Sequence, residues 1–128
     1  MEIEDLMTRD WVSFRGKPVR IEEISRPTQK VCVSTPRMVA CPKVFEIEPI
    51  LITPEILEKN GFNKNPDNSG FILVCNSVHL TWGFYKNCLS ISDWDYGGDN
   101  QISSVRCLYV HTLQHILRLC RIDKKIIL

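Results

Sequence analysis

The sequence lacks a long apolar run, which argues against a membrane-spanning helix. No stretch of the 128 residues approaches the roughly 18 to 20 apolar positions needed to cross a bilayer. The first residues, MEIEDLMTRDW, are acidic and show no apolar run behind a basic start, so a secretory signal is not expected. We therefore expect a soluble protein that stays in the cytoplasm.

The sequence also lacks an excess of charge of either sign. Lys and Arg total 16 against 15 Asp and Glu, which gives a net charge of +1 and removes the simplest argument for nucleic-acid binding. Apolar residues make up 44% and charged residues 24%, as in globular proteins with a real core, so disorder is not expected. The length fits one compact domain, or a small module fused to a slightly larger one.

Signature motifs of enzymes are missing as well. The chain contains no G-x-S-x-G, no P-loop and no dinucleotide-binding glycine pattern. Its cysteines form neither a C-x-x-C pair nor a zinc spacing. Because no secretion signal is expected, we predict reduced thiols, not disulfides, at Cys32, Cys41, Cys75, Cys88, Cys107 and Cys120. We predict no catalytic activity, no cofactor and no bound metal.

An amphipathic segment over residues 106–120 is the feature that organises the rest. One side of this helical pattern is apolar: Tyr109, Val110, Leu113, Ile116, Leu117 and Cys120. The other side is polar: His111, Gln114, His115 and Arg118. We expect a long C-terminal helix that lies across a sheet or another helix. Leu108 and Leu119 fall on the polar side, which indicates a second covering layer or a partner, including a second copy of the chain.

A second, shorter helix is predicted from local signals near residues 53–61. Thr53 suits the N-cap, Pro54 the first helical position and Glu55 the positive end of the helix dipole. Gly61 suits a left-handed stop.

Short strands separated by proline and glycine are predicted for the rest of the chain. In the N-terminal part we expect strands at residues 11–14, 19–24, 31–33, 38–40 and 44–47. In the C-terminal part we expect residues 71–82 as one strand, or as two broken near 76–77, then a strand at 84–91. Residues 122–128 are expected as a last strand or an anchored end.

The predicted fold class is α+β in two parts. Residues 1–48 are expected to form an SH3-like small β-barrel. Residues 49–128 are expected to form an α+β unit of short helix, β-hairpin and long amphipathic C-terminal helix. The alternative is that all 128 residues form one compact domain.

Three sequence blocks together resemble a known family. They are Asp10-Trp-Val with Gly16-Lys-Pro, Glu48-Pro-Ile with the segment 53–62, and the segment 109–115 with Leu117-Arg-Leu-Cys120. This combination resembles a group of short uncharacterised proteins of anaerobic gut bacteria that are often encoded by prophages or other mobile elements. The resemblance implies a compact two-part α+β protein without an established activity, and it assigns no catalytic residue. The family's usual Gly after the final Cys is Arg121 here.

Two groups of residues could bind a metal ion, but each also has an ordinary structural explanation. His111 and His115 have the i, i+4 spacing that presents two imidazoles to one zinc ion, with His79 or a cysteine as a third ligand. Thr112 stands where a metalloprotease would have Glu, and a solvated polar helix face explains both histidines equally. A calcium loop at Asp93, Asp95, Asp99 and Asn100 lacks the EF-hand register, and a hairpin with one solvated side explains it.

A basic stretch in the N-terminal part is the candidate nucleic-acid site. Its residues are Arg9, Arg15, Lys17, Arg20, Arg26, Lys30, Arg37 and Lys43. Trp11 and Phe14 lie among them and could stack on bases, or they could fill the core. We predict a non-catalytic binding protein that acts through contacts with a protein partner. Nucleic-acid binding through the basic stretch is the alternative, and a metal-dependent hydrolase using His111 and His115 is the third hypothesis.

Overall fold

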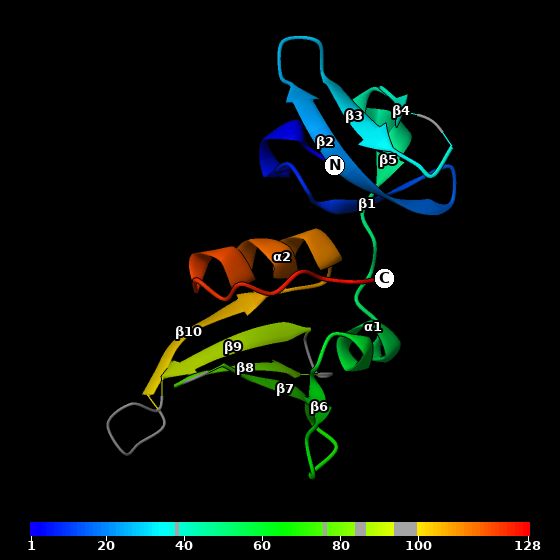
Figure 1. Cartoon of the computed structure of the whole chain (residues 1–128). Coiled ribbons are helices and arrows are strands. Elements are labelled where there is room, and N and C mark those ends of the chain that lie inside the picture. Colours follow the sequence, from blue (N-terminus) through cyan, green and yellow to red (C-terminus); the bar gives the residue numbers. More distant parts are fainter. Residues whose placement is uncertain (38, 76, 84–86, 94–99) are drawn as a thin grey trace. The chain divides into compact units, whose positions relative to one another are not determined.

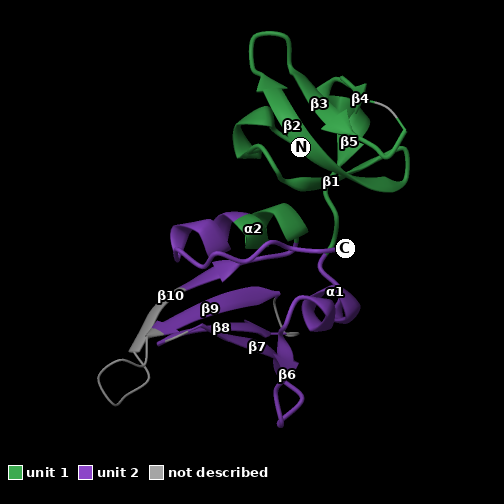
Figure 2. Ribbon diagram, viewed as in Figure 1, with its two compact units in different colours: residues 1–51, 109–114 green, residues 52–108, 115–128 purple. Residues whose placement is uncertain are grey.

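The chain divides into two compact units, each assembled from two stretches of sequence. The computed structural model describes residues 1–37, 39–75, 77–83, 87–93 and 100–128. Unit 1 comprises Met1–Leu51 and Tyr109–Gln114, and unit 2 comprises Ile52–Leu108 and His115–Leu128 (Figure 2). The division passes through the C-terminal helix, so neither unit corresponds to a single segment.

Unit 1 is built on an antiparallel sheet of five strands (Figure 1). Its elements are the 3-10 helix η1 (Ile3–Asp5), β1 (Trp11–Phe14), β2 (Lys17–Ser25), β3 (Lys30–Ser34), β4 (Val39–Ala40), the 3-10 helix η2 (Val44–Glu46) and β5 (Ile47–Glu48). The strand order is β4-β3-β2-β1-β5. Alternate side chains of each strand point to one face, and there they form the core: Ile3, Leu6, Val12, Val19, Ile21, Val31, Val33, Val44 and Ile47.

The sheet of unit 1 does not close into a barrel, so the prediction of an SH3-like barrel over residues 1–48 is wrong. Among the described strands, the edge strands β4 and β5 do not pair with each other, and each has two residues. Residues 44–47 were expected as one strand, but most of them form η2. Local bonds favour this turn: the Lys43 N–H donates to Glu46 Oε2 at 2.7 Å, and the Glu46 N–H donates to the Lys43 carbonyl at 2.9 Å.

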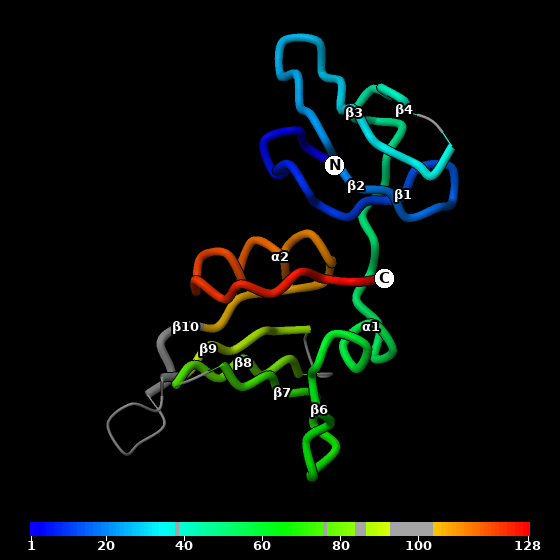
Figure 3. Tube along the Cα trace, in the orientation of Figure 1, coloured from blue at the N-terminus to red at the C-terminus, as the bar shows by residue number. Residues whose placement is uncertain are grey.

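Unit 2 contains a second antiparallel sheet of five strands, in which the strands follow one another along the chain (Figure 3). Its elements are α1 (Pro54–Lys59), β6 (Asn63–Lys64), β7 (Gly70–Cys75), β8 (Val78–Gly83), β9 (Cys88–Asp93), β10 (Asn100–Arg106) and the second part of α2 (Val110–Leu119). Its buried apolar side chains include Leu57, Phe62, Phe71, Leu73, Leu80, Trp82, Leu89, Ile116, Leu117 and Ile126. The predicted break between residues 71 and 82 is confirmed, because β7 and β8 pair as a hairpin.

The short helix predicted near residue 53 is confirmed as α1. The Ile56 N–H donates to Thr53 Oγ1 at 3.3 Å, and Gly61 adopts φ +88° after the helix. Asn60, buried at the end of α1, pairs with the backbone of Ile127: it donates to the carbonyl at 2.8 Å and accepts from the N–H at 2.7 Å. The final residues are thus anchored by a side-chain amide, which is the second of the two predicted alternatives.

The C-terminal helix is shorter than predicted. The pattern predicts a helix over residues 106–120, whereas α2 has 10 residues. The first residues of the predicted helix belong to or follow the sheet instead. Arg106 is the last residue of β10, and the Cys107 N–H donates to the Asn87 carbonyl at 2.7 Å. Arg121 ends the helix in the left-handed region at φ +56°, a conformation that usually falls to glycine.

The predicted fold class, α+β with a long C-terminal helix, is therefore wrong. Strands make up 42% of the described residues, and the two α-helices among them have 6 and 10 residues. The chain is mostly β, with two antiparallel sheets. None of the helices within the described ranges is long and apolar enough to cross a membrane.

Candidate functional site

A cavity at one end of unit 1 is lined entirely by described residues. Its volume is about 320 Å³, and its lining residues are Ser13, Phe14, Arg15, Gly16, Glu46 and Glu48. Pairing of β1 with β5 builds it, because Ser13 lies opposite Glu48. Pockets for small molecules measure roughly 300 to 1,000 Å³, so this cavity lies at the small end of that range.

The cavity combines an aromatic ring with charges of both signs. The Arg15 guanidinium carbon lies 4.9 Å from the centroid of the Phe14 ring, which is a cation–π geometry. Glu46 and Glu48 supply two carboxylates against this one guanidinium, and both are exposed. Glu46 Oε2 accepts the Lys43 N–H, whereas Glu48 makes no side-chain hydrogen bond or ion pair with described residues. The lining therefore favours a ligand with a positive charge.

An exposed aromatic side chain stands beside this lining in sequence. Phe45 is 75% exposed, while Val44 and Ile47 are buried. The three-residue period of η2 explains the difference, because side chains three apart share a side and the intervening ones do not. Phe45, Glu46 and Glu48, with Phe14 and Arg15, are called the η2 surface below.

The structure distributes the predicted basic residues over unit 1 and does not gather them into one patch. Arg15 and Lys17 lie at the start of β2, while Arg26 follows its end. The two ends of β2 are separated by about 26 Å, because its nine residues are joined by eight steps of roughly 3.3 Å each. Lys30 lies directly opposite Lys43, at the same end as Arg26.

The remaining basic residues fall elsewhere in the unit. Arg37 follows β3, whose Ser34 pairs with Arg20, and so it lies toward the start of β2. The Arg9 N–H donates to the Ile21 carbonyl at 2.7 Å, which places Arg9 beside the middle of β2. Seven of the eight predicted residues are exposed, and Arg20 is half-buried.

The two aromatic side chains of β1 each make a cation–π contact with an arginine of the same unit. The Arg20 guanidinium lies 5.4 Å from the centroid of Trp11, as Arg15 does at Phe14. Phe14 also packs against the core of unit 1. Both rings are half-buried, so they serve as supports for arginine side chains within the unit.

The predicted polar face of the C-terminal helix is largely buried. His111 is 6% exposed, and its ring stacks on Tyr109 with centroids 5.7 Å apart. Gln114 is 7% exposed; its Oε1 accepts the Trp11 N–H at 2.8 Å and its Nε2 donates to the Arg9 carbonyl at 3.0 Å. The amide is buried because it satisfies these backbone groups, which helical periodicity does not reveal.

Neither metal hypothesis gains support from the described residues. Within the described residues, no group of three or more His, Cys, Asp and Glu side chains could hold a metal ion. His115 is half-buried and falls in unit 2, whereas His111 falls in unit 1. Asp95 and Asp99 of the calcium hypothesis lie outside the described residues.

The prediction of reduced thiols throughout is wrong for one pair. Cys32 and Cys41 form a disulfide, whereas Cys75, Cys88, Cys107 and Cys120 are thiols. Burial raises the pKa of the Cys107 thiol to about 12, and it also raises the pKa of Cys120. Cys107 is therefore a neutral, buried side chain, as predicted, whereas Cys75, Cys88 and Cys120 are only half-buried.

Sequence reasoning missed the η2 surface and the disulfide. The spacing of Val44 and Ile47, three residues apart, could have indicated a 3-10 turn with Phe45 outside. A β-hairpin centred near Pro36 would have placed Cys32 opposite Cys41. Both signals depend on the register of short strands, which composition does not determine.

Comparison with known proteins adds no assignment to this geometry. No protein-family model, no curated protein and no solved structure matches the chain. The resemblance to short prophage-associated proteins therefore stays a prediction.

Proposed function

We propose that the chain is a non-catalytic binding protein that contacts a protein partner through the η2 surface. The observation that carries this proposal is the 75% exposure of Phe45. A Phe side chain left in water forgoes roughly 1.5 to 3 kcal/mol of burial energy. Aromatic side chains of this kind are the anchors that partner surfaces bury most often.

The cavity lined by Glu46, the residue after Phe45, indicates the chemistry of the partner. Its volume of about 320 Å³ accommodates one long side chain. Glu48 offers a carboxylate without a partner among described residues, and the Phe14 ring that lines the same cavity already stacks with Arg15. A Lys or Arg of the partner would enter the cavity, with an apolar residue next to it on Phe45.

The test compares two exposed apolar side chains, one in each unit. The variant is Phe45→Ser, and the control is Leu119→Ser, since Leu119 is 82% exposed at the end of α2. Each tagged protein is used to capture partners from the native host, and bound proteins are quantified by mass spectrometry. A partner held by wild type and Leu119→Ser should fall at least about tenfold with Phe45→Ser. Equal capture by all three proteins would contradict the proposal.

A second variant tests the expected charge of the partner. Glu48→Gln removes one carboxylate of the cavity, and Glu58→Gln removes an exposed carboxylate of α1 as a control. We expect the affinity for the captured partner to fall about three- to tenfold with Glu48→Gln, because a charged hydrogen bond is lost. Unchanged affinity would leave Phe45 as the anchor but reject a basic side chain in the cavity.

Nucleic-acid binding is a second candidate, supported by one pairing. Lys30 and Lys43 lie directly opposite each other, with Arg26 nearby at the same end of the sheet. Like charges in a cross-strand pair repel, and a polyanion would relieve this repulsion. Binding of a fluorescent single-stranded oligonucleotide should weaken with rising salt and with Lys30→Gln/Lys43→Gln. If Arg15→Gln/Lys17→Gln weakens binding equally, the site is not at this end.

A further inference from the structure

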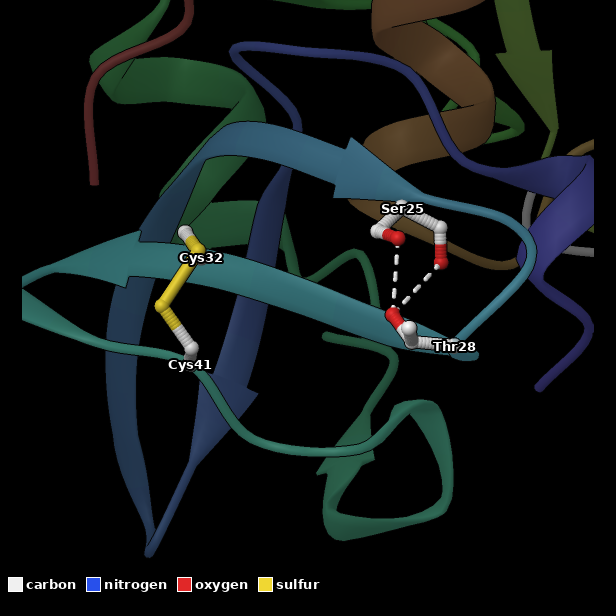
Figure 4. Close-up of a disulfide and its surroundings, with 4 residues drawn as sticks. All are labelled: Ser25, Thr28, Cys32 and Cys41. Atoms are coloured by element: carbon white, nitrogen blue, oxygen red, sulfur yellow. Dashed lines mark hydrogen bonds between the residues drawn. A yellow bond between two sulfur atoms is a disulfide. The ribbon is translucent and has the colours of Figure 1, made fainter.

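We propose that the Cys32–Cys41 disulfide is a thiol–disulfide exchange site, which a dithiol reductant opens in the folded protein. Figure 4 shows the bond linking β3 to the neighbouring segment. The register explains why the two cysteines meet. Val33 pairs with Ala40 on one side of them and Lys30 with Lys43 on the other, so Cys32 lies directly opposite Cys41.

The cysteines occupy the more closely spaced type of cross-strand pair. The Val31 N–H donates to the Pro42 carbonyl at 3.0 Å, so this neighbouring pair is a hydrogen-bonded one. In an antiparallel sheet the next pair is then a non-hydrogen-bonded one, in which the strands approach more closely. The Cα atoms of Cys32 and Cys41 are 4.1 Å apart, as this position requires.

The disulfide faces away from the core and is open to attack. Cys41 is exposed and Cys32 is half-buried, whereas Val31 and Val33 on the opposite face are fully buried. A thiolate can therefore approach Cys41 Sγ without disturbing the core. Exposed disulfides exchange more readily than buried structural ones.

Two lysines flank the disulfide on its own face. Lys30 lies two residues before Cys32, and Lys43 lies two residues after Cys41. Alternate residues of a strand share a face, so the lysine pair is the neighbour of the cysteine pair. Both lysines are exposed and carry positive charge. Ammonium groups beside a disulfide attract an attacking thiolate. They also stabilise the thiolate that departs, which makes it a better leaving group.

The exchange proceeds in two displacements and transfers two electrons. One thiolate of the dithiol attacks Cys41 Sγ, forming a mixed disulfide and breaking the bond to Cys32, which leaves as a thiolate. The second thiolate of the dithiol then attacks the first sulfur of the same dithiol, which is bonded to Cys41, and releases Cys41 as a thiolate. Two protons from the dithiol or solvent complete the Cys32 and Cys41 thiols, and the dithiol becomes a disulfide.

Opening the bond would loosen the outer edge of unit 1. β4 has two residues and pairs only with β3 among the described strands. Pro42 has no N–H to return a bond to Val31, so the ladder beside the cysteines is incomplete. With the disulfide open, we expect residues 39–44 to exchange their amide hydrogens faster, while β1 and β2 keep their protection.

The test measures reduction of the folded protein by dithiothreitol. Thiols are blocked at intervals with one alkylating reagent, the rest are then reduced and labelled with another, and the Cys32 and Cys41 peptides are quantified by mass spectrometry. The variant is Lys30→Gln/Lys43→Gln, and the control is Arg15→Gln/Lys17→Gln, two cations at the other end of β2. We expect reduction about three- to tenfold slower in the lysine variant and unchanged in the control.

Each outcome decides between an exchange site and an inert crosslink. Reduction without denaturant, slowed only by the lysine variant, supports the proposal. A bond that resists dithiothreitol until the protein unfolds, or equal rates in all three proteins, overturns it. Cys32→Ser/Cys41→Ser supplies an independent measurement: its hydrogen exchange over residues 39–44 should match that of reduced wild type, and protection equal to the oxidised protein would contradict the loosened edge.

Discussion

Unit 1 and unit 2 contain antiparallel sheets of equal strand number but pair their strands differently. In unit 2 the order β10-β9-β8-β7-β6 follows the chain, so each strand pairs with the next. In unit 1 the chain returns after β4, and β5 pairs with β1, where Ile47 lies opposite Phe14. Consecutive hairpins depend on local turns, whereas the return pairing depends on residues distant in sequence. The cavity of unit 1 exists because of this return pairing.

The units also differ in where they place reactive and aromatic side chains. Unit 2 buries Phe62, Phe71 and Trp82, and the Trp82 Nε1–H donates to the Cys107 carbonyl at 2.9 Å. Unit 1 leaves Phe45 exposed and carries its disulfide on an outward face. Among the described residues, unit 1 therefore exposes an aromatic ring and a disulfide, whereas these three rings of unit 2 lie in its core.

The largest expected effect is on unit 2, from Gly70→Ala. A Cβ at Gly70 would clash with the Trp82 carbonyl oxygen and lie 3.0 Å from the Gly83 Cα, so backbone would have to move. We expect a loss of about 3 kcal/mol or more in the free energy of unfolding. Hydrogen exchange should show lost protection in β7 and β8 before β2.

Gly16→Ala in unit 1 is the matched control. No atom lies within 4 Å of a Cβ there, although φ is +75°. The strained backbone alone should cost about 1 to 2 kcal/mol. A loss equal to that of Gly70→Ala would show that crowding between β7 and β8 does not limit unit 2.

The next effect compares a buried amide in each unit. Asn60→Ala removes both bonds to Ile127, and Gln114→Ala removes those to Trp11 and Arg9. Each change leaves backbone groups without partners and should cost about 2 to 3 kcal/mol in denaturant unfolding. Protease susceptibility should rise after Asn60→Ala at the tail and after Gln114→Ala near β1. Exposure of both sites in either variant would mean that the units do not open separately.

A smaller, stabilising effect is expected from Arg121→Gly. Arg121 holds φ +56° after α2, and the Ile122 N–H donates to the Leu117 carbonyl at 2.9 Å around it. Glycine removes the steric cost of this conformation but adds freedom to the unfolded chain, so the net gain should be about 0.5 to 1 kcal/mol. A decrease in the thermal midpoint would show that the Arg121 side chain contributes more than its backbone costs.

The smallest effect concerns thiol reactivity. Burial raises the pKa of Cys107 from 9.0 to about 12, so folding favours the neutral thiol. At pH 8 only about one Cys107 in ten thousand is ionised, and iodoacetamide should not label it in the folded protein. Because the unfolded thiol ionises first, the stability from this group is full below pH 9.0 and declines as the pH rises above it. Labelling of Cys107 as fast as that of reduced Cys41 would contradict its burial.

The sequence supports those elements whose signals are local. The bounds predicted for β1 are confirmed, and α1 follows from Thr53, Pro54 and Gly61 because capping and turn chemistry act within a few residues. The length of α2 is not predicted, since residue 106 satisfies the helical pattern but pairs with Cys88 in the sheet. Pairing across the chain overrides local periodicity at that point.

The candidate site was less accessible to sequence reasoning than the fold. The basic residues are conspicuous in sequence, yet β2 separates them by its own length. Glu46 and Glu48 belong to no recognisable sequence motif. They share a cavity with Phe14 only because β5 pairs with β1. A site of this type depends on register, which single-sequence patterns leave undetermined.

The membership of Gln114 in unit 1 has a consequence for biosynthesis. Residues 1–51 cannot satisfy the Trp11 N–H and the Arg9 carbonyl as they do here until residue 114 has left the ribosome. The strands of the N-terminal sheet are therefore synthesised before the residue that completes their hydrogen bonding. In the interval, the Trp11 N–H and the Arg9 carbonyl are available to chaperones or to neighbouring nascent chains. A gene fragment that ends at residue 51 would hold unit 1 in that unfinished condition permanently.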